Sequence, residues 1–313
     1  MNGKLLYYWI TCPDVRRESI AFIILLILLT SLSGCSEERG SPEGSLVIKD
    51  ALNRKVVIER APERIVSLAP SVTEILFAVG AGDRVVGVTK YCDYPEEAKE
   101  RAKVGDITHP DIERILSLSP DLVIAHRLND IEVIKKLDEL GIPVIALEER
   151  SLEDVMESIE LIGKITGCEE NATRIVERMR ERIKEINESV QRRGVRVMVV
   201  VWHDPVWIAG GETFIDDMIK ICGGVNVFED VRGYQIVGYE KMIAKDPEII
   251  IVMRDDETGE IPYEAIMKDE RLSSISAVKN GRVYMIDADI LSRPSPRLMD
   301  GLEELFKIIQ EET

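Results

Sequence analysis

Two related stretches decide the fold of this chain: ERILSLSPDLVIA at residues 113–125 and EKMIAKDPEIIIV at residues 240–252. Each begins with a glutamate that opens a short helical pattern and carries a proline seven residues later. An acidic residue and an apolar run follow the proline, as is typical of a buried strand. A unit that recurs at corresponding places indicates two pseudo-symmetric halves.

On either side of these stretches, short apolar segments typical of strands alternate along the chain with segments of helical periodicity. After a predicted hairpin (46–48 and 56–58), the first series has strands at 64–68, 85–89, 122–125 and 144–147, and helices at 71–79, 112–118 and 131–140. The second has strands at 196–201, 249–252 and 283–286, and helices at 213–222, 239–244 and 297–309. This alternation predicts an α/β fold: two pseudo-symmetric lobes with parallel-sheet βαβ units, joined by one long rigid helix.

The joining helix is predicted over residues 169–193, where one series stops and the other begins. Its apolar stripe is Ile175, Met179, Ile183 and Ile186. At about 1.5 Å per residue it would be roughly 37 Å long, enough to bridge two lobes, although a surface helix of a single domain is the alternative. The predicted domains are a signal peptide (1–34), a tether (35–45), an N-terminal lobe (46–168), the helix (169–193) and a C-terminal lobe (194–313).

The first 35 residues have the pattern of an export signal. Arg16 and Arg17 precede an apolar run that ends in Leu-Ser-Gly-Cys35, which resembles the lipid-attachment motif of lipoproteins. The run is shorter than the ~20 residues of a membrane-spanning helix, the alternative interpretation. We therefore expect cleavage before Cys35, lipid on that cysteine, and anchoring to the outer face of the cell membrane. The stretch before Arg16 is unusual for a signal peptide, so the true start codon stays open.

Composition excludes some partners. The 57 acidic and 40 basic residues give a formal charge of -17, which disfavours nucleic-acid binding. Without Cys12 in the leader and Cys35, the cysteines are Cys92, Cys168 and Cys222. Their odd number and lack of CxxC spacing indicate free thiols rather than a disulfide framework or a metal site.

Polar and aromatic residues follow the predicted strands. In parallel α/β lobes, ligands bind outside the carboxyl ends of the strands. The residues at these positions are Tyr91, His126, Arg127, Trp202, His203, Trp207 and the segment from Asp287 to Arg293. The sequence therefore predicts a ligand cleft that both lobes line.

The three histidines, His109, His126 and His203, all lie in these loops. Imidazole ligates several transition metals, so a metal-dependent enzyme with an interlobe site is the alternative from another class. The chain has no HExxH, GxSxG or GxxxxGK[ST] motif, which favours binding without catalysis, and we assign no catalytic or metal-ligating residue and no cofactor. Ser71 to Glu74 matches a capping box, which predicts that Glu74 bonds back to the start of its own helix.

Four motifs together resemble the cobalamin and ferric-siderophore binding proteins of ABC importers. They are RIVSLAPSVTE (64–74), YCDYP (91–95), IERI with PDLV (112–123) and RPSPR (293–297). The resemblance extends over about residues 64–309. It implies two lobes that move little on binding, and partnership with a permease dimer and its ATPase.

By this resemblance, ligand-binding residues are expected at Tyr91, His126, Trp207, Tyr234, Asp289, Ile290, Leu291, Ser292 and Arg293. His126 stands where a cobalamin binder has tryptophan, and Ile290 and Ser292 replace an aromatic residue and an acid. The expected ligand is cobalamin, with haem or a ferric siderophore as the alternative. Arg127 and Arg293 would suit an anionic chelate.

The repeated glutamates, Glu113 and Glu240, are expected to dock on the two-fold symmetric permease. The resemblance implies this role, and the repeat places both at the start of matching helices. Alternatively, each carboxylate only complements a helix dipole. A sensor that displays its ligand to a receptor is a further alternative to an importer component.

Overall fold

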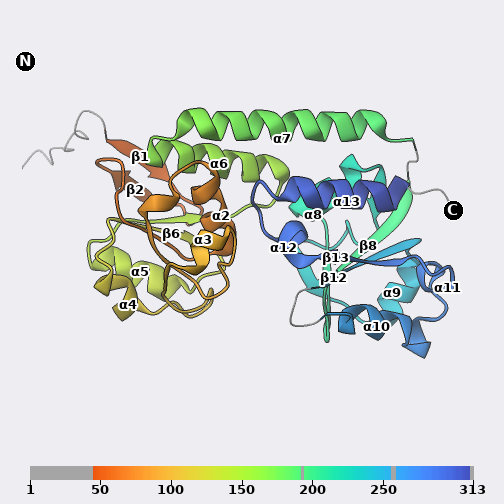
Figure 1. The fold of residues 1–313 in the computed structure, drawn as a ribbon. Coiled ribbons are helices and arrows are strands. Elements are labelled where there is room, and N and C mark those ends of the chain that lie inside the picture. The colour runs from red at the N-terminus through yellow and green to blue at the C-terminus, as the bar shows by residue number, and fades with distance from the viewer. Residues whose placement is uncertain (1–44, 192–193, 255–258, 311–313) are drawn as a thin grey trace, which may run out of the picture. The chain divides into compact units, whose positions relative to one another are not determined.

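A computed structural model describes residues 45–191, 194–254 and 259–310 of the chain (Figure 1). The chain from Leu46 onward forms one compact unit. The predicted signal peptide and all but Ser45 of the predicted tether lie outside the described residues, as does Cys35. None of the described helices is both long and apolar enough to span a bilayer.

The first sheet has five parallel strands in the order β5-β4-β3-β6-β7. Its strands are β3 (Ile65–Ser67), β4 (Val85–Val88), β5 (Ala102–Lys103), β6 (Leu122–His126) and β7 (Val144–Leu147). The helices and 3-10 turn beside them are α2 (Pro70–Ala78), η1 (Gly82–Arg84), α3 (Glu96–Lys99), α4 (Ile112–Ser117) and α5 (Ile131–Glu139). A hairpin of β1 (Leu46–Lys49) and β2 (Lys55–Ile58) precedes them. We call this part the N-terminal lobe.

The second sheet, in the C-terminal lobe, has six strands and is mixed. Its order is β11-β9-β8-β12-β13, with β10 paired to β8. The strands are β8 (Val195–His203), β9 (Val206–Ala209), β10 (Gly224–Asn226), β11 (Tyr234–Ile236), β12 (Ile249–Arg254) and β13 (Val283–Asp287). The α/β class is confirmed, but β9 and β11 run antiparallel to their partners, which the prediction of parallel βαβ units did not include.

Helices cover the second sheet and connect it to the first. Those of the C-terminal lobe are α8 (Phe214–Ile221), α9 (Tyr239–Lys245), α10 (Ile261–Met267), η2 (Glu270–Leu272), α11 (Ser276–Lys279), α12 (Ala288–Ser292) and α13 (Leu298–Gln310). Before them, α6 (Leu152–Thr166) ends at Gly167, whose φ of 67° lets the chain turn directly into α7 (Glu169–Ser189).

Helix α7 is shorter than predicted. It ends at Ser189 rather than at residue 193, because Val190 already has extended backbone angles (φ -65°, ψ 119°). Residues 192–193 lie outside the described residues. Three residues of its predicted stripe, Ile175, Met179 and Ile186, are buried, and α7 contacts α6, α8 and α13. The helix therefore packs against elements of both lobes (Figure 1). The predicted domain limits stay a prediction.

The repeated stretches have the same local structure. Helix α4 leads through Ser119 (φ 47°) and Pro120 into β6, and α9 leads through Asp246 (φ 39°) and Pro247 into β12. Arg64 donates through Nε and Nη2 to Leu118 O at 3.0 and 2.6 Å, at the end of α4. Arg196 donates through the same two nitrogens to Asp246 O at 3.1 and 2.8 Å, at the end of α9.

One apolar core continues through both lobes. It includes Ile75 of α2, Ile159 of α6, Val176 of α7, Ile215 of α8 and Leu302 of α13, each at most 1% exposed. Because interiors pack as densely as organic crystals, a core shared in this way resists relative movement of the parts that it joins.

Candidate ligand-binding cavity

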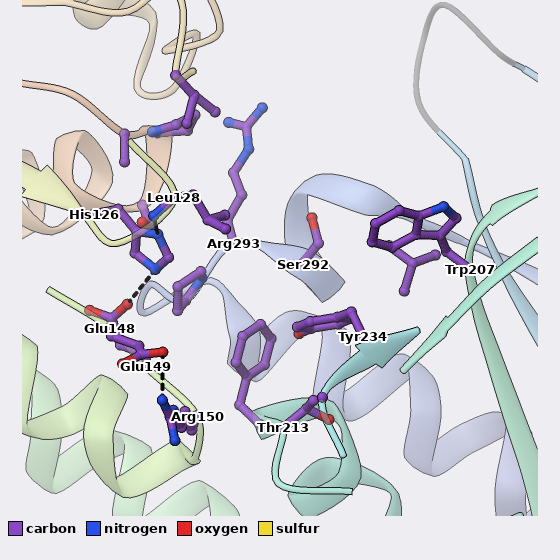
Figure 2. Close-up of a pocket in the computed structure, with 18 of the residues that line it drawn as sticks. His126, Leu128, Glu148, Glu149, Arg150, Trp207, Thr213, Tyr234, Ser292 and Arg293 are labelled. Carbon is purple, nitrogen blue, oxygen red and sulfur yellow. Dashed lines mark hydrogen bonds and ion pairs between the residues drawn. The ribbon is translucent and has the colours of Figure 1, made fainter. Parts of the chain in front are cut away.

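A cavity of about 900 Å³ lies where loops of both lobes meet (Figure 2). Its lining is Ala69, Pro70, Ser71, Tyr91, Ile107, His126, Leu128, Glu148, Glu149, Arg150, Val201, Trp207, Glu212, Thr213, Phe214, Arg232, Gly233, Tyr234, Asp289, Ser292, Arg293 and Pro294. This volume is near the upper end of the ~300–1,000 Å³ typical of small-molecule pockets.

Sheet topology explains the position of the cavity. In the first sheet β3 has β4 on one side and β6 on the other, so the connections leave in opposite directions from its carboxyl end. Such a switch point opens a crevice at the ends of the strands. Pro70 follows β3 and His126 ends β6, and both line the cavity.

Seven of the nine predicted ligand-binding residues line the cavity: Tyr91, His126, Trp207, Tyr234, Asp289, Ser292 and Arg293. Ile290 and Leu291 do not, because the segment is a helix (α12) rather than an extended strand exit. Positions three and four residues apart share one face of a helix, which groups residues 289, 292 and 293. Leu291 is fully buried and Ile290 packs against the same core, which explains why neither side chain lines the cavity.

Aromatic rings face the cavity from both lobes. Tyr91 is 46% exposed and Trp207 is 39% exposed, which is high for such large side chains and leaves their rings open to a ligand. Figure 2 shows Trp207 and Tyr234 across the cavity from His126. Burial raises the pKa of the Tyr234 phenol, which disfavours its phenolate form.

Each arginine of the cavity wall already has a carboxylate partner. Arg150 lies 2.9 Å from Glu148, Arg232 lies 2.6 Å from Glu212, and Arg293 lies 2.5 Å from Asp289. Arg127, expected to suit an anionic ligand, does not line the cavity and lies 3.2 Å from Glu148. With four carboxylates and three guanidinium groups in its lining, the cavity offers little net attraction to an anion.

Each ring nitrogen of His126 has a polar neighbour, but only the contact at Nδ1 is a hydrogen bond, and Glu149 Oε2 has no hydrogen-bond partner among the described residues. The Leu128 backbone N–H donates to Nδ1 at 3.1 Å, so the ring hydrogen is on Nε2, which faces Glu149 Oε2 at 3.2 Å. His109 instead lies beside Asp106, and His203 packs against the Trp202 ring at 5.0 Å. Among the residues that the structure describes, no three or more histidine, cysteine or acidic side chains form a group that could hold a metal ion. The three histidines therefore do not meet at one site, as the alternative of a metal-dependent enzyme would require.

Glu74 does not cap its own helix, which corrects the capping-box prediction. The N-cap of α2 is Ala69, without a side-chain hydrogen bond. The Glu74 carboxylate instead accepts hydrogen bonds from Arg293 and Arg297 at 3.1 Å each and from the Ser295 hydroxyl at 2.6 Å. Hydrogen bonds to the C-terminal lobe thus replace the predicted hydrogen bond to the Ser71 backbone.

The three residues after β7, Glu148, Glu149 and Arg150, are part of the cavity lining that sequence reasoning missed. The strand was predicted, and the rule that ligands bind after strand ends would have selected them. The same rule would have selected Leu128, which is 70% exposed and follows β6, whereas Phe214 at the start of α8 had no such signal.

The two glutamates of the repeat are exposed in the first turns of α4 and α9. The side chains of Glu113 and Glu240 have no hydrogen bond or ion pair within the described ranges. In the view of Figure 1, α4 and α9 lie in the lower half of the molecule, whereas α7 runs along its top.

Comparisons with known proteins identify the family. The family model described as "Periplasmic binding protein" matches residues 65–290. The chain is 34% identical over 317 residues to the uncharacterized ABC transporter substrate-binding lipoprotein YvrC of Bacillus subtilis (strain 168), covering 96% of this chain and 99% of that protein. The chain thus belongs to the periplasmic binding proteins, and it is an extracytoplasmic solute-binding protein of an ABC transporter.

Two solved structures have the same fold. The periplasmic vitamin B12 binding protein BtuF of Vibrio cholerae is 29% identical, with a TM-score of 0.69 over 80% of this chain and 97% of that chain. The periplasmic heme-binding protein RhuT of Roseiflexus sp. RS-1, in its apo form, is 26% identical, with a TM-score of 0.71 over 79% of this chain and 98% of that chain.

Proposed function

We propose that this protein captures a cobalamin-type ligand outside the cell and delivers it to the permease of an ABC importer. The observation that carries the proposal is the cavity of about 900 Å³ with rings from both lobes and with its guanidinium groups already paired. A corrinoid is large and flat, and it presents neutral amides around its edge. Aromatic faces and hydrogen-bonding groups suit it better than unpaired positive charge. The similarity to a vitamin B12 binding protein supports the same ligand.

An iron chelate, as haem or a ferric siderophore, is the runner-up, and the similarity to a heme-binding protein favours it. Three features of the cavity argue against it. His126 has no free nitrogen lone pair for iron, and the raised pKa of Tyr234 disfavours a phenolate ligand. Haem propionates would also compete with carboxylates for Arg150, Arg232 and Arg293.

A binding panel tests the proposed ligand. The purified mature protein is titrated with cyanocobalamin, cobinamide, haemin and ferric siderophores by calorimetry, and its melting temperature is recorded with each. A ligand that binds only the native state raises the melting temperature. We expect the largest increase with cyanocobalamin. Tighter binding of haemin or a ferric siderophore would replace cobalamin with an iron chelate as the ligand.

We also propose that lipid on Cys35 anchors the protein. The motif that ends at Cys35 and the similarity to a substrate-binding lipoprotein support this. Cys35→Ser should move the protein from the membrane fraction to the soluble fraction. An unchanged distribution would contradict the anchor and leave the ligand proposal unaffected.

The proposed partner is a permease dimer with its ATPase, and Glu113 and Glu240 are the proposed contacts. Their exposure and their matching positions on α4 and α9 support this role. Carboxylates presented in this way would meet paired basic sites on a two-fold symmetric surface.

A further inference from the structure

Glu74 is a buried carboxylate whose side-chain partners among the described residues all come from the other lobe. It belongs to α2 of the N-terminal lobe, and its side chain is 2% exposed. One oxygen, Oε1, accepts from Arg293 and from Arg297, and the other, Oε2, accepts from Ser295. We call these four residues the Glu74 cluster. A buried carboxylate is costly unless charged partners and hydrogen bonds compensate it, and in the part of the chain that the structure describes the C-terminal lobe supplies them.

The same cluster holds a residue of the cavity wall. Arg293 lines the cavity and also lies 2.6 Å from Asp93 and 2.5 Å from Asp289. Partial burial would raise the pKa of Asp93, but the hydrogen bonds and charge of Arg293 bring it below its usual value. Arg293 therefore connects α2, the loop after β4 and α12, and its position depends on all three.

Arg297 joins the cluster to the loop that follows β4. Its guanidinium group lies over the Tyr94 ring, 4.1 Å from the centroid, and its Nη1 reaches Glu74. Glu74 itself is absent from the cavity lining. It can influence a bound ligand only through the residues that it holds.

We propose that Glu74 is a positioning residue for ligand binding: it fixes Arg293 at the cavity wall and joins the two lobes there. The part that concerns affinity rests on the proposed function. A guanidinium group that is held in place loses less freedom on binding, so affinity increases without a new contact. Glu74→Gln is the informative variant, because it keeps the shape of the side chain and removes the one negative charge that Arg293 and Arg297 share.

The first test uses the apo protein and does not depend on the ligand. Hydrogen exchange is compared between wild type and Glu74→Gln. We expect exchange at least tenfold faster in both α2 and residues 292–298, with β6 and β12 unchanged. Asp50→Asn is the matched control, since Asp50 is a buried carboxylate whose arginine partner, Arg54, lies in the same lobe. Unchanged exchange in Glu74→Gln, or a change in α2 alone, would overturn the joining role.

The second test is a double-mutant cycle on affinity, with cyanocobalamin or haemin, whichever binds the wild type. Glu74→Gln should weaken binding about tenfold in the wild-type background and less than twofold in the Arg293→Gln background. Equal effects in both backgrounds, or no effect in either, would overturn the role of Glu74 in positioning Arg293. If neither probe binds the wild type, the proposed ligand class fails, and hydrogen exchange still decides whether Glu74 joins the lobes.

Discussion

Tyr91 presents an exposed ring to the cavity, and we expect it to anchor the ligand. Tyr91→Ala should weaken cyanocobalamin binding about tenfold, or ~1.4 kcal/mol, because ring contact and buried area are lost together. Calorimetry measures the change. Trp202→Ala is the control, since Trp202 is equally exposed (44%) but does not line the cavity. Unchanged affinity in Tyr91→Ala, or equal losses in both variants, would remove the anchor role.

Asp289 gives the stability of the protein a specific pH dependence. Burial raises its pKa to about 6, although Arg293 lies 2.5 Å away. The folded protein therefore binds more protons than the unfolded chain between about pH 4 and 6. The contribution of this group to the free energy of unfolding rises as the pH falls through that window.

Asp289→Asn should remove this gain. From pH 7.5 to pH 5, wild type should gain about 1 kcal/mol of unfolding free energy relative to the variant, a value reduced for solvent screening of a partly exposed group. Urea unfolding at the two pH values measures the difference. A constant gap between the two proteins would show that Asp289 titrates alike in the folded and unfolded states.

The residues of the site were predictable to different degrees. Tyr91, His126 and Trp207 follow predicted strands, so local pattern alone selects them. Glu74 had a plausible local partner in its own helix turn, and no pattern reveals that Arg293, Ser295 and Arg297 compete for it. The burial of Leu291 away from the cavity could not be predicted, because the short helix α12 had not been predicted.

At the scale of helices and strands, the two arginine contacts at the ends of α4 and α9 are the most specific feature. Arg64 and Arg196 place positive charge on carbonyl groups that no helical N–H satisfies. Arg64→Ala and Arg196→Ala should each lower the free energy of unfolding by about 1 kcal/mol in urea. Arg60→Ala, at an exposed arginine, is the control and should have little effect. Losses no larger than in Arg60→Ala would show that solvent replaces these contacts.

Long apolar-periodic elements were predicted to within a few residues, and short ones were missed. The missed strands β5, β9, β10 and β11 have two to four residues each, too few to show a period. Because β9 and β11 were not predicted, their antiparallel pairing was not predicted either. The end of α7 was overestimated because charged residues continue after Ser189 without a break in composition.

For the whole molecule, the paired glutamates predict how it meets its importer. Glu113→Ala with Glu240→Ala should leave the ligand affinity and the melting temperature unchanged while uptake through the cognate permease is severely reduced. Uptake and permease binding are measured at moderate salt. Glu132→Ala with Glu264→Ala is the matched control, because both are exposed first-turn glutamates of other helices. Normal uptake by the first double variant would leave both glutamates as helix-end residues only.

The Glu74 cluster also bears on how long the protein survives. Its hydrogen bonds join residues 219, 221 and 223 positions apart in the chain, so they can form only after both lobes are largely assembled. Contacts absent from the folding transition state slow unfolding without speeding folding. Glu74→Gln should therefore raise the unfolding rate about fivefold and leave the refolding rate unchanged in stopped-flow experiments. An equal slowing of refolding would place the contact early in folding. When a protease cleaves the opened chain faster than the chain refolds, the rate of degradation is set by the unfolding rate. For this protein outside the cytoplasm, resistance to proteolysis would then depend on the Glu74 carboxylate.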